Sequence, residues 1–260
     1  MLVFAAIMPH PPESIPGIGN EDDFKAIEKT LHSFDELRKG IENSDPDTVI
    51  IISPHAHLEQ YSFVINSSSI LKGSFVDFGL DDIYEYENNI VFANKLAFAG
   101  LMNDLPTHLH ESFLDHGALI PIHHLLENIK PKIVHLSFSL MDYHRQYFYG
   151  EIIQRVIDMG SGGRVAVVAS ADLSHKLTPI SPAGFSPGAL KFDRDILHFL
   201  GAYDKASILG LQPEALAEAA ECGVRSIIIL LGILHGRKHE FNLLSYEYPF
   251  GIGYMTARLL

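Results

Sequence analysis

The amino-acid sequence predicts an α/β fold: a single domain whose central, largely parallel or mixed sheet is covered by helices on both faces. The main observation is that apolar, β-branched runs of strand length alternate with longer segments in which apolar residues recur every three or four positions. The second is size, since 260 residues with 47% hydrophobic content are enough for one large core. We therefore expect one domain over residues 1–260, without a linker or an internal repeat.

Four runs are the expected strands of the sheet centre, because nearly continuous apolar sequence is typical of strands buried on both faces. Two further pairs are expected at the margins, a local hairpin and a pair of closing strands. In chain order the central runs are Leu2–Met8, Thr48–Ser53, Ile133–Phe138 and Val165–Ser170, the hairpin is Phe63–Asn66 with Phe75–Phe78, and the closing pair is Leu243–Glu247 with Gly253–Arg258.

Between these runs the apolar spacing predicts amphipathic helices that would cover the sheet. They are Phe24–Asn43, Asn89–Leu101, Pro121–Asn128, Tyr147–Asp158, Ala189–Leu200, Pro213–Ala220 and the apolar run Ser226–Leu234. Two segments rich in Pro, Gly and Ser, residues 11–20 and 176–188, each follow a histidine at a strand end. Such segments are either lids over a site or plain surface connections.

Composition excludes several classes of partner. Lys and Arg number 19 against 32 Asp and Glu, a net charge of −13, and no basic run occurs, so nucleic acid is not an expected partner. No apolar run reaches the roughly 20 residues of a bilayer span, and the N-terminal segment lacks the pattern of a secretory signal. The single cysteine, Cys222, fits a reducing compartment, so a cytoplasmic location without a membrane partner is expected.

Three histidines fall just past the ends of three expected strands: His10, His55 and His175. In open α/β sheets ligands bind at the carboxyl ends of the strands, so these imidazoles would converge on one crevice if their strands are neighbours. A single histidine at a strand end is more often structural. Three of them favour a metal or proton-transfer site at the C-terminal ends of the strands.

A carboxylate would complete such a site, because two imidazoles and one carboxylate form the facial triad of non-haem Fe(II) centres. Glu221 is the best candidate, since its neighbours in sequence are small or apolar, although an exposed glutamate at a helix end is the alternative. Cys222 is adjacent, and a thiolate is also a metal ligand that favours softer ions such as zinc or copper.

Asp115-His116-Gly117 precedes an apolar helix start, which suits a ring held near a ligand at a helix N-terminus. The alternative is an aspartate that caps the helix beside an incidental histidine. His57, two residues beyond His55, would face the same side in an extended chain and is expected to contact substrate or support the ligands.

Five short motifs occur in order along the whole chain, through the closing segment 249–254: Met8-Pro-His-Pro-Pro12, Ser53-Pro-His-Ala-His57, Leu114-Asp-His-Gly-Ala-Leu-Ile-Pro-Ile122, Ser170-Ala-Asp-Leu-Ser-His175 and Glu221-Cys-Gly223. Their order and spacing resemble the class III extradiol dioxygenase catalytic-subunit (LigB-like) family. That family includes the large subunit of protocatechuate 4,5-dioxygenase and the plant-type DOPA dioxygenases. The related Memo-like branch is similar, but has a cysteine in place of the carboxylate ligand.

The resemblance implies Fe(II) held by His10, His55 and Glu221, with His175 as the acid–base histidine and His116 in contact with the substrate. The residues expected to contact substrate or support these groups are His57, Asp115, Asp172 and Cys222. Because Glu221 and Cys222 are adjacent, either matches the third ligand position. We predict Glu221, since oxygen and nitrogen donors suit Fe(II).

The predicted function is therefore an Fe(II)-dependent extradiol ring-cleaving dioxygenase acting on a catechol-type or related aromatic substrate and O2. Two alternatives stay open: a Memo-like metal-binding protein with a redox or signalling role, and a hydrolase that holds Zn(II) with the same ligands while His175 steers water. A homodimer is the default assembly, because cyclic dimers are the commonest soluble oligomers.

Overall fold

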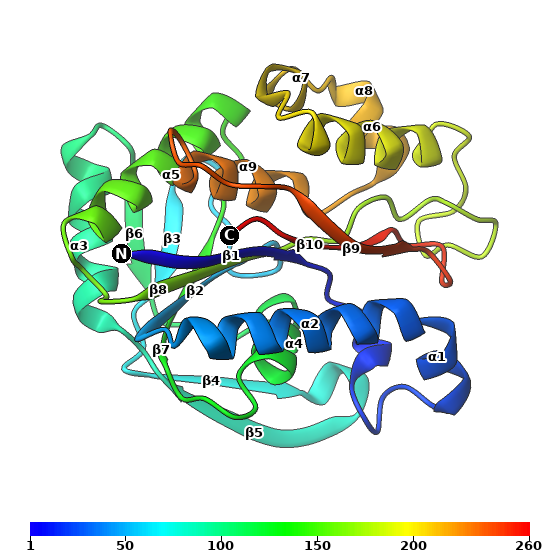
Figure 1. The fold of residues 1–260 in the computed structure, drawn as a ribbon, viewed down its shortest axis with the longest axis horizontal. Coiled ribbons are helices and arrows are strands. Elements are labelled where there is room, and N and C mark those ends of the chain that lie inside the picture. Colours follow the sequence, from blue (N-terminus) through cyan, green and yellow to red (C-terminus); the bar gives the residue numbers. More distant parts are fainter.

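The computed structural model describes residues 1–260 and confirms the predicted α/β class (Figure 1). An eight-stranded mixed sheet has the strand order β6-β3-β7-β2-β8-β1-β10-β9. Its centre is the parallel set β7 (Lys132–Ser137), β2 (Thr48–Ser53), β8 (Val165–Ser170) and β1 (Leu2–Met8), which matches the four apolar runs. These strands are almost wholly buried, as continuous apolar sequence requires.

Antiparallel pairings flank the parallel centre on both sides. The predicted closing strands are β9 (Asn242–Glu247) and β10 (Tyr254–Arg258), and β10 pairs with β1. On the other side β3 (Phe63–Asn66) runs antiparallel to β7 and parallel to the edge strand β6 (Thr107–His110). β6 was not predicted, because four residues, three of them polar, are too few for a periodic signal.

The predicted hairpin was wrong in its partners. Phe63–Asn66 is fully buried in the main sheet, where pairing on both edges satisfies its backbone. The hairpin is instead β4 (Ile70–Phe75) with β5 (Leu80–Glu87), a separate two-stranded sheet joined through the 3-10 turn Val76–Phe78. Gly79 closes that turn at a φ of 90°, a left-handed conformation that glycine adopts without strain.

Helices cover both faces of the sheet. In Figure 1, α5 and α9 lie above it, and α2 and α4 below it with the β4–β5 ribbon beyond. The first group comprises α3 (Ile90–Met102), α5 (Tyr143–Asp158) and α9 (Val224–Ile233), and the second α2 (Glu28–Ser44) and α4 (His116–Leu125). The remaining helices are α1 (Glu21–Ala26), α6 (Ala189–Gly201), α7 (Lys205–Leu209), α8 (Pro213–Ala219) and the 3-10 turn Pro12–Ser14.

Several helices differ from expectation in their bounds: α5, for example, begins at Tyr143, four residues before the predicted start. The helix predicted over residues 24–43 is divided at Ile27 into α1 and α2. α4 begins at His116, earlier than the predicted Pro121, because Asp115 caps it by accepting a hydrogen bond from the backbone of Ala118. Segment 176–188 contains neither helix nor strand, and Ser181 anchors it by donating to the carbonyl of Gly251 at 2.9 Å.

The register of the central strands sets the position of the site. Ile7 of β1 and Ile52 of β2 both pair with Ala169 of β8, so the three strands end at one level. Residues that follow them therefore emerge at the same edge of the sheet. No helix of the structure combines the length and apolar character that crossing a bilayer requires.

Candidate metal centre

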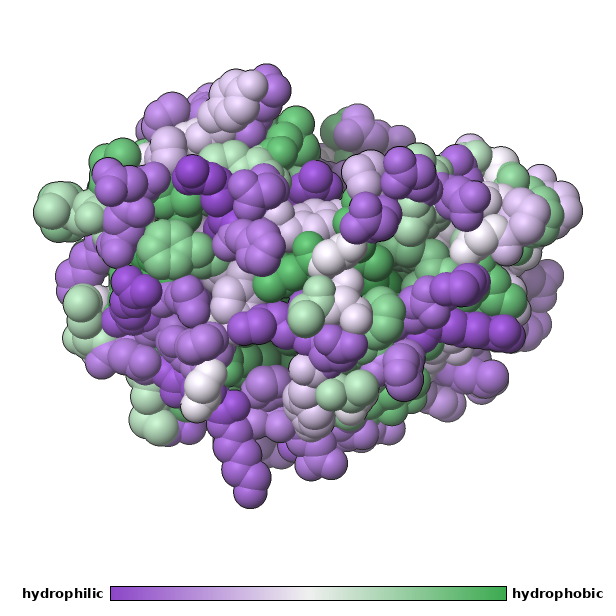
Figure 2. All heavy atoms as spheres, turned by 90° about the horizontal axis from the view of Figure 1, so that it is seen from above, coloured by the Kyte–Doolittle hydropathy of each residue, from purple (hydrophilic) through white to green (hydrophobic).

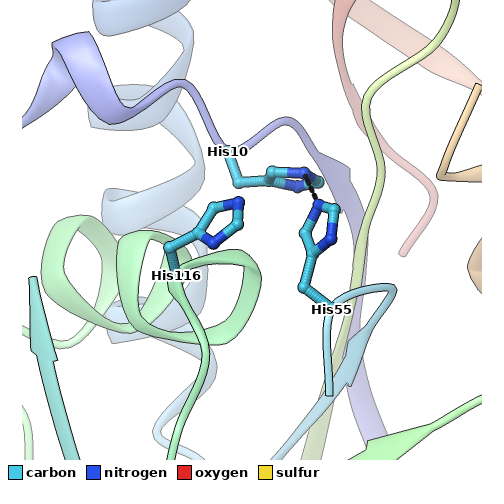
Figure 3. Close-up of side chains that lie close together, drawn as sticks. All are labelled: His10, His55 and His116. Carbon is cyan, nitrogen blue, oxygen red and sulfur yellow. Dashed lines mark hydrogen bonds between the residues drawn. The ribbon is translucent and has the colours of Figure 1, made fainter. Parts of the chain in front are cut away.

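Three imidazoles from three separate elements point toward one another at this edge (Figure 3). His10 follows β1, His55 follows β2, and His116 is the first residue of α4. The Nε2 atoms of His10 and His55 are 3.1 Å apart, and the rings of His55 and His116 stack with centroids at 4.4 Å. One ring nitrogen from each histidine lies within 4.8 Å of the others.

His10 also belongs to a second group of potential ligands, formed with Cys222 and Asp172. Its Nε2 is 3.6 Å from Sγ of Cys222 and 3.5 Å from a carboxylate oxygen of Asp172. All three ligand atoms lie within 4.8 Å of one another. His10 is therefore the shared member of two donor groups, and its Nε2 faces His55 in one and Cys222 and Asp172 in the other.

These residues fit a divalent transition metal in spacing and in protonation. Ligands bonded at about 2.1 Å lie roughly 3.0–3.4 Å apart around one ion, which is the range of the His10–His55 separation. Burial and the neighbouring imidazoles hold the pKa of His10 well below its ordinary value. Burial and His116 lower that of His55 to about 4. Neutral imidazoles are the form that binds metal.

A proline in α4 determines how the His10 ring is oriented. Pro121 lies inside α4 and has no N–H, so the carbonyl of Gly117, four residues earlier, has no helical donor. The hydroxyl of Ser170 donates to that carbonyl at 2.5 Å. Its oxygen is then left to accept from Nδ1 of His10 at 2.8 Å. This arrangement fixes the tautomer in which Nε2 of His10 carries the lone pair.

A second hydrogen-bond network, centred on Asp115, supports the segments that carry His55 and His116. Asp115 accepts hydrogen bonds from Ser53 at 2.5 Å and from His135 of β7 at 3.0 Å. Burial alone would raise the pKa of Asp115, but the hydrogen bond and charge of His135 and the Ser53 hydroxyl bring it below its ordinary range. Since Asp115 precedes His116 and Ser53 lies just before His55, one carboxylate ties both histidine-bearing segments together.

Gly117 makes the close approach of these segments possible. A Cβ at this position would lie 2.7 Å from Oγ of Ser53 and 3.1 Å from the ring of His55. The motif glycine after His116 is thus required for packing against the end of β2.

The Glu221–Cys222 segment places its two side chains differently from the sequence expectation. Oε2 of Glu221 accepts from the backbone N–H of Val224 at 2.6 Å, at the start of α9, and Glu221 is in neither donor group. Cys222 instead points to His10. Gly223 allows this, because a Cβ there would lie 2.4 Å from that of Ala171. Burial raises the pKa of the Glu221 carboxyl, and it raises that of the Cys222 thiol well above its ordinary value.

His175 lies beside the cluster, and one of its ring nitrogens makes a hydrogen bond to the backbone. Its Nδ1 donates to the carbonyl of Leu173 at 3.0 Å, so Nε2 carries the lone pair. Burial lowers the pKa of His175, and its charge is near enough to lower those of His10 and His55. Asp172, whose pKa burial raises to about 7, accepts from the backbone N–H of His10 at 2.9 Å.

His57 lies apart from the cluster. Its ring stacks on that of His110 with centroids at 4.2 Å, and its Nε2 is 3.9 Å from a carboxylate oxygen of Glu59. The structure thus brings together His10, His55, His116, Asp172 and Cys222, with His175 beside them, and leaves His57 and Glu221 outside the donor groups.

Sequence reasoning missed three supporting residues: Ser53, His135 and Ser170. The available signal was a polar residue within or at the end of a mainly apolar strand, since all three lie on strands that are almost wholly buried. A buried polar group in such a strand needs a partner, and here the partner belongs to the site.

Comparison with known proteins supports the resemblance drawn from the motifs. A family model described as the catalytic LigB subunit of aromatic ring-opening dioxygenase matches residues 4–257. Protein CA_C1420 of Clostridium acetobutylicum is 31% identical over 265 residues, covering 97% of this chain. The match takes in 56% of that protein, so the chain spans about half the length of this curated relative.

A solved structure shares the fold. The crystal structure of the uncharacterized protein JW3007 from Escherichia coli K12 superposes with a TM-score of 0.73. The match covers 99% of this chain and 100% of that one at 14% sequence identity, which shows similarity of fold alone.

Proposed function

Because the chain belongs to the family of the catalytic LigB subunit of aromatic ring-opening dioxygenase, we propose that it is an Fe(II)-dependent extradiol dioxygenase. It would insert both atoms of O2 into a catechol-type or related aromatic ring. The observation that carries this proposal is the convergence of the motif histidines His10, His55 and His116 at one edge of the sheet, with His175 beside them.

In this proposal His10 and His55 hold the metal, and the third ligand comes from the Glu221–Cys222 segment. Fe(II), when bound, would supply open coordination positions for the substrate oxygens and for O2. The residues fit this role because their ligand atoms are spaced like neighbours around one ion and the imidazoles are neutral. Zn(II) fits the same donor types.

His175 is the proposed acid–base residue. Its Nδ1 donates to the carbonyl of Leu173, so its Nε2 carries the lone pair that would take the proton from a substrate hydroxyl and return it later. The lowered pKa keeps the ring neutral, as a base requires. His116 is proposed to hydrogen-bond the substrate, and the ring of Phe78, with its centroid 5.4 Å from that of His116, offers an apolar wall for an aromatic ring.

The test is anaerobic reconstitution with Fe(II), followed by oxygen uptake on a panel of catechols that differ in charge and size. Ring opening is read from the coloured muconic-type product, and protein loaded with Zn(II) is the matched control because it cannot supply redox chemistry. We expect uptake with at least one catechol in the Fe(II) protein only. Full Fe(II) occupancy without uptake on any member of the panel would refute the activity.

A second function is favoured by one specific observation, the position of Cys222. Its sulfur lies 3.6 Å from Nε2 of His10, while Glu221 binds the backbone of Val224. This is the donor set of the Memo-like branch, in which a cysteine replaces the carboxylate. A protein of that type would bind metal through Cys222 and serve a redox or signalling role without ring cleavage. Metal analysis after purification without chelators, together with the oxygen-uptake panel, separates the two functions.

A further inference from the structure

A cavity of about 280 Å³ lies among α5, α6, α7, α9 and the chain end, and it shares no residue with the metal centre. Its walls are mainly apolar, with Phe199 from α6, Leu231 from α9, and Phe241. α9 begins just after Cys222 and its ten residues run toward the cavity, a length of about 15 Å. The cavity is therefore a separate site. Figure 2 views the molecule from above, the side on which α5, α6, α7 and α9 lie in Figure 1, and apolar side chains appear there among polar ones.

Polar groups gather at one end of this cavity. The hydroxyl of Tyr147 lies 2.8 Å from Nδ1 of His235, and the ammonium of Lys205 is 3.5 Å from the same hydroxyl. The ammonium also lies over the Tyr147 ring, 4.5 Å from its centroid. An apolar cavity with a few convergent polar groups is the usual form of a small-molecule site.

The charge at this end favours an anion. Acidic residues outnumber basic ones by 32 to 19, yet the Lys205 ammonium pairs with no carboxylate and contacts Tyr147 instead. Glu151, whose carboxylate lies 3.3 Å from Nδ1 of His235, does not line the cavity. The lining thus contains one lysine, Lys205, and no carboxylate.

Another part of the wall is formed by the residues that follow α6 and by the segment 239–241. Tyr203 has a φ of 55°, in the left-handed region that bulky residues rarely adopt. Its hydroxyl donates to the carbonyl of His239 and accepts from the backbone N–H of Phe241, both at 3.3 Å. These three residues all line the cavity. The left-handed residue ends α6, where the backbone N–H of Asp204 donates to the carbonyl of Phe199 at 2.8 Å, and the two hydrogen bonds of the Tyr203 hydroxyl hold this part of the wall in place.

We propose that this cavity binds a small amphipathic carboxylate, with its anionic group at Lys205 and Tyr147 and its apolar tail between α6 and α9. A compact aromatic acid or a medium-chain fatty acid has this chemistry, because the cavity is at the lower end of the volumes that enclose small ligands. This site lies outside the proposed dioxygenase centre and does not depend on its activity.

The test is titration of the full chain with octanoate by isothermal calorimetry, compared with 1-octanol and octylammonium, which carry the same tail. We expect one saturable site for octanoate, weaker binding of the alcohol, and octylammonium weaker than octanoate by at least about tenfold. The chain has no tryptophan, so Phe241→Trp provides a unique fluorescent reporter in the cavity wall. Its emission should change at the same octanoate concentration.

Two variants locate the site. Lys205→Met keeps the apolar stem and should weaken octanoate roughly fivefold, as expected for a partly exposed charge pair. Leu231→Trp should fill the cavity and abolish binding. Lys191→Met, an exposed lysine of α6 outside the cavity, is the matched control and should bind like the native chain. Lack of saturable octanoate binding, octylammonium binding within twofold of octanoate, or native affinity in Lys205→Met would overturn the proposal.

Discussion

The strand-end histidines and the Glu221–Cys222 segment contribute to one site but are positioned by different means. His10 and His55 follow buried parallel strands of matched register, so the sheet itself determines where their side chains emerge. Glu221 and Cys222 lie between α8 and α9, after Ala220 with a φ of 52°. In such a turn one change of dihedral angle exchanges which neighbour faces the cluster. Regular elements thus make side-chain direction predictable, and turns do not.

The largest effect should come from removing a strand-end histidine. His10→Ala and His55→Ala should each lower metal affinity by more than about a hundredfold, since loss of a mere supporting residue costs about 10–100-fold. Bound metal is measured by elemental analysis after dialysis against a fixed concentration of free ion. His57→Ala, a neighbouring histidine outside the donor groups, is the matched control. Full occupancy in both alanine variants would remove these histidines from the ligand set.

His175 tests whether a strand-end position can serve proton transfer instead of metal binding. His175→Ala should keep the metal but lose about 10²–10⁴-fold in turnover on any accepted substrate, the usual contribution of general acid–base catalysis. Substrate affinity should change much less. Metal content, substrate binding and turnover are measured on one preparation. Loss of metal would make His175 a ligand, and unchanged turnover would make it structural.

The strand-end histidines show which features of the fold and site can be predicted from the sequence and which cannot. Continuous apolar runs were sufficient to predict the four central strands, and Pro-His after two of them was sufficient to predict the edge where His10 and His55 meet. The edge strand β6 and the partners of Phe63–Asn66 were missed, because they depend on long-range pairing that leaves no local pattern. The sequence does not predict a role for His135, which is buried within β7 and lies 3.0 Å from a carboxylate oxygen of Asp115.

The sequence prediction and the structure differ most at the third metal ligand. The sequence predicted Glu221, and the geometry favours Cys222. We therefore expect Cys222→Ser, which leaves a hydroxyl oxygen as a weaker donor in place of the thiolate, to lower metal affinity about 10–100-fold, and Glu221→Gln to retain it. Substitution with Co(II) gives an independent readout. A near-ultraviolet thiolate-to-cobalt band should be present in the native chain and in Glu221→Gln, and absent in Cys222→Ser. The reverse pattern of metal loss would restore Glu221 as the ligand.

A smaller effect is expected for the hydrogen bonds that orient the His10 ring. Ser170 accepts from Nδ1 of His10 and donates to the carbonyl of Gly117, which Pro121 leaves without a helical donor. Ser170→Ala should weaken metal binding about tenfold and destabilise the fold by about 1–3 kcal/mol, because the buried Nδ1–H of His10 loses its acceptor. Pro121→Ala supplies a helical N–H that competes for the carbonyl of Gly117, so it should weaken metal binding slightly without loss of stability. Equal metal affinity in the native chain and both variants would show that this chain of hydrogen bonds does not orient the ligand.

The smallest effect concerns Glu221 as a buried helix cap. Burial raises its folded-state pKa above the ordinary value of 4.5, so the folded chain binds more protons than the unfolded chain just above that pH. The contribution of this carboxyl to the free energy of unfolding should therefore fall as pH rises from about 4.5, by at most about 1.4 kcal/mol per pH unit. Glu221→Gln can still accept from the N–H of Val224 but does not titrate, so its metal-free unfolding free energy should lack this decline. Denaturant unfolding of both proteins between pH 4.5 and 7.5, in the presence of chelator, measures the difference. Parallel pH profiles would mean that the Glu221 carboxyl is not desolvated in the folded chain. In that case Glu221 would not be the carboxylate bound to the backbone of Val224 while Cys222 faces the metal ligands.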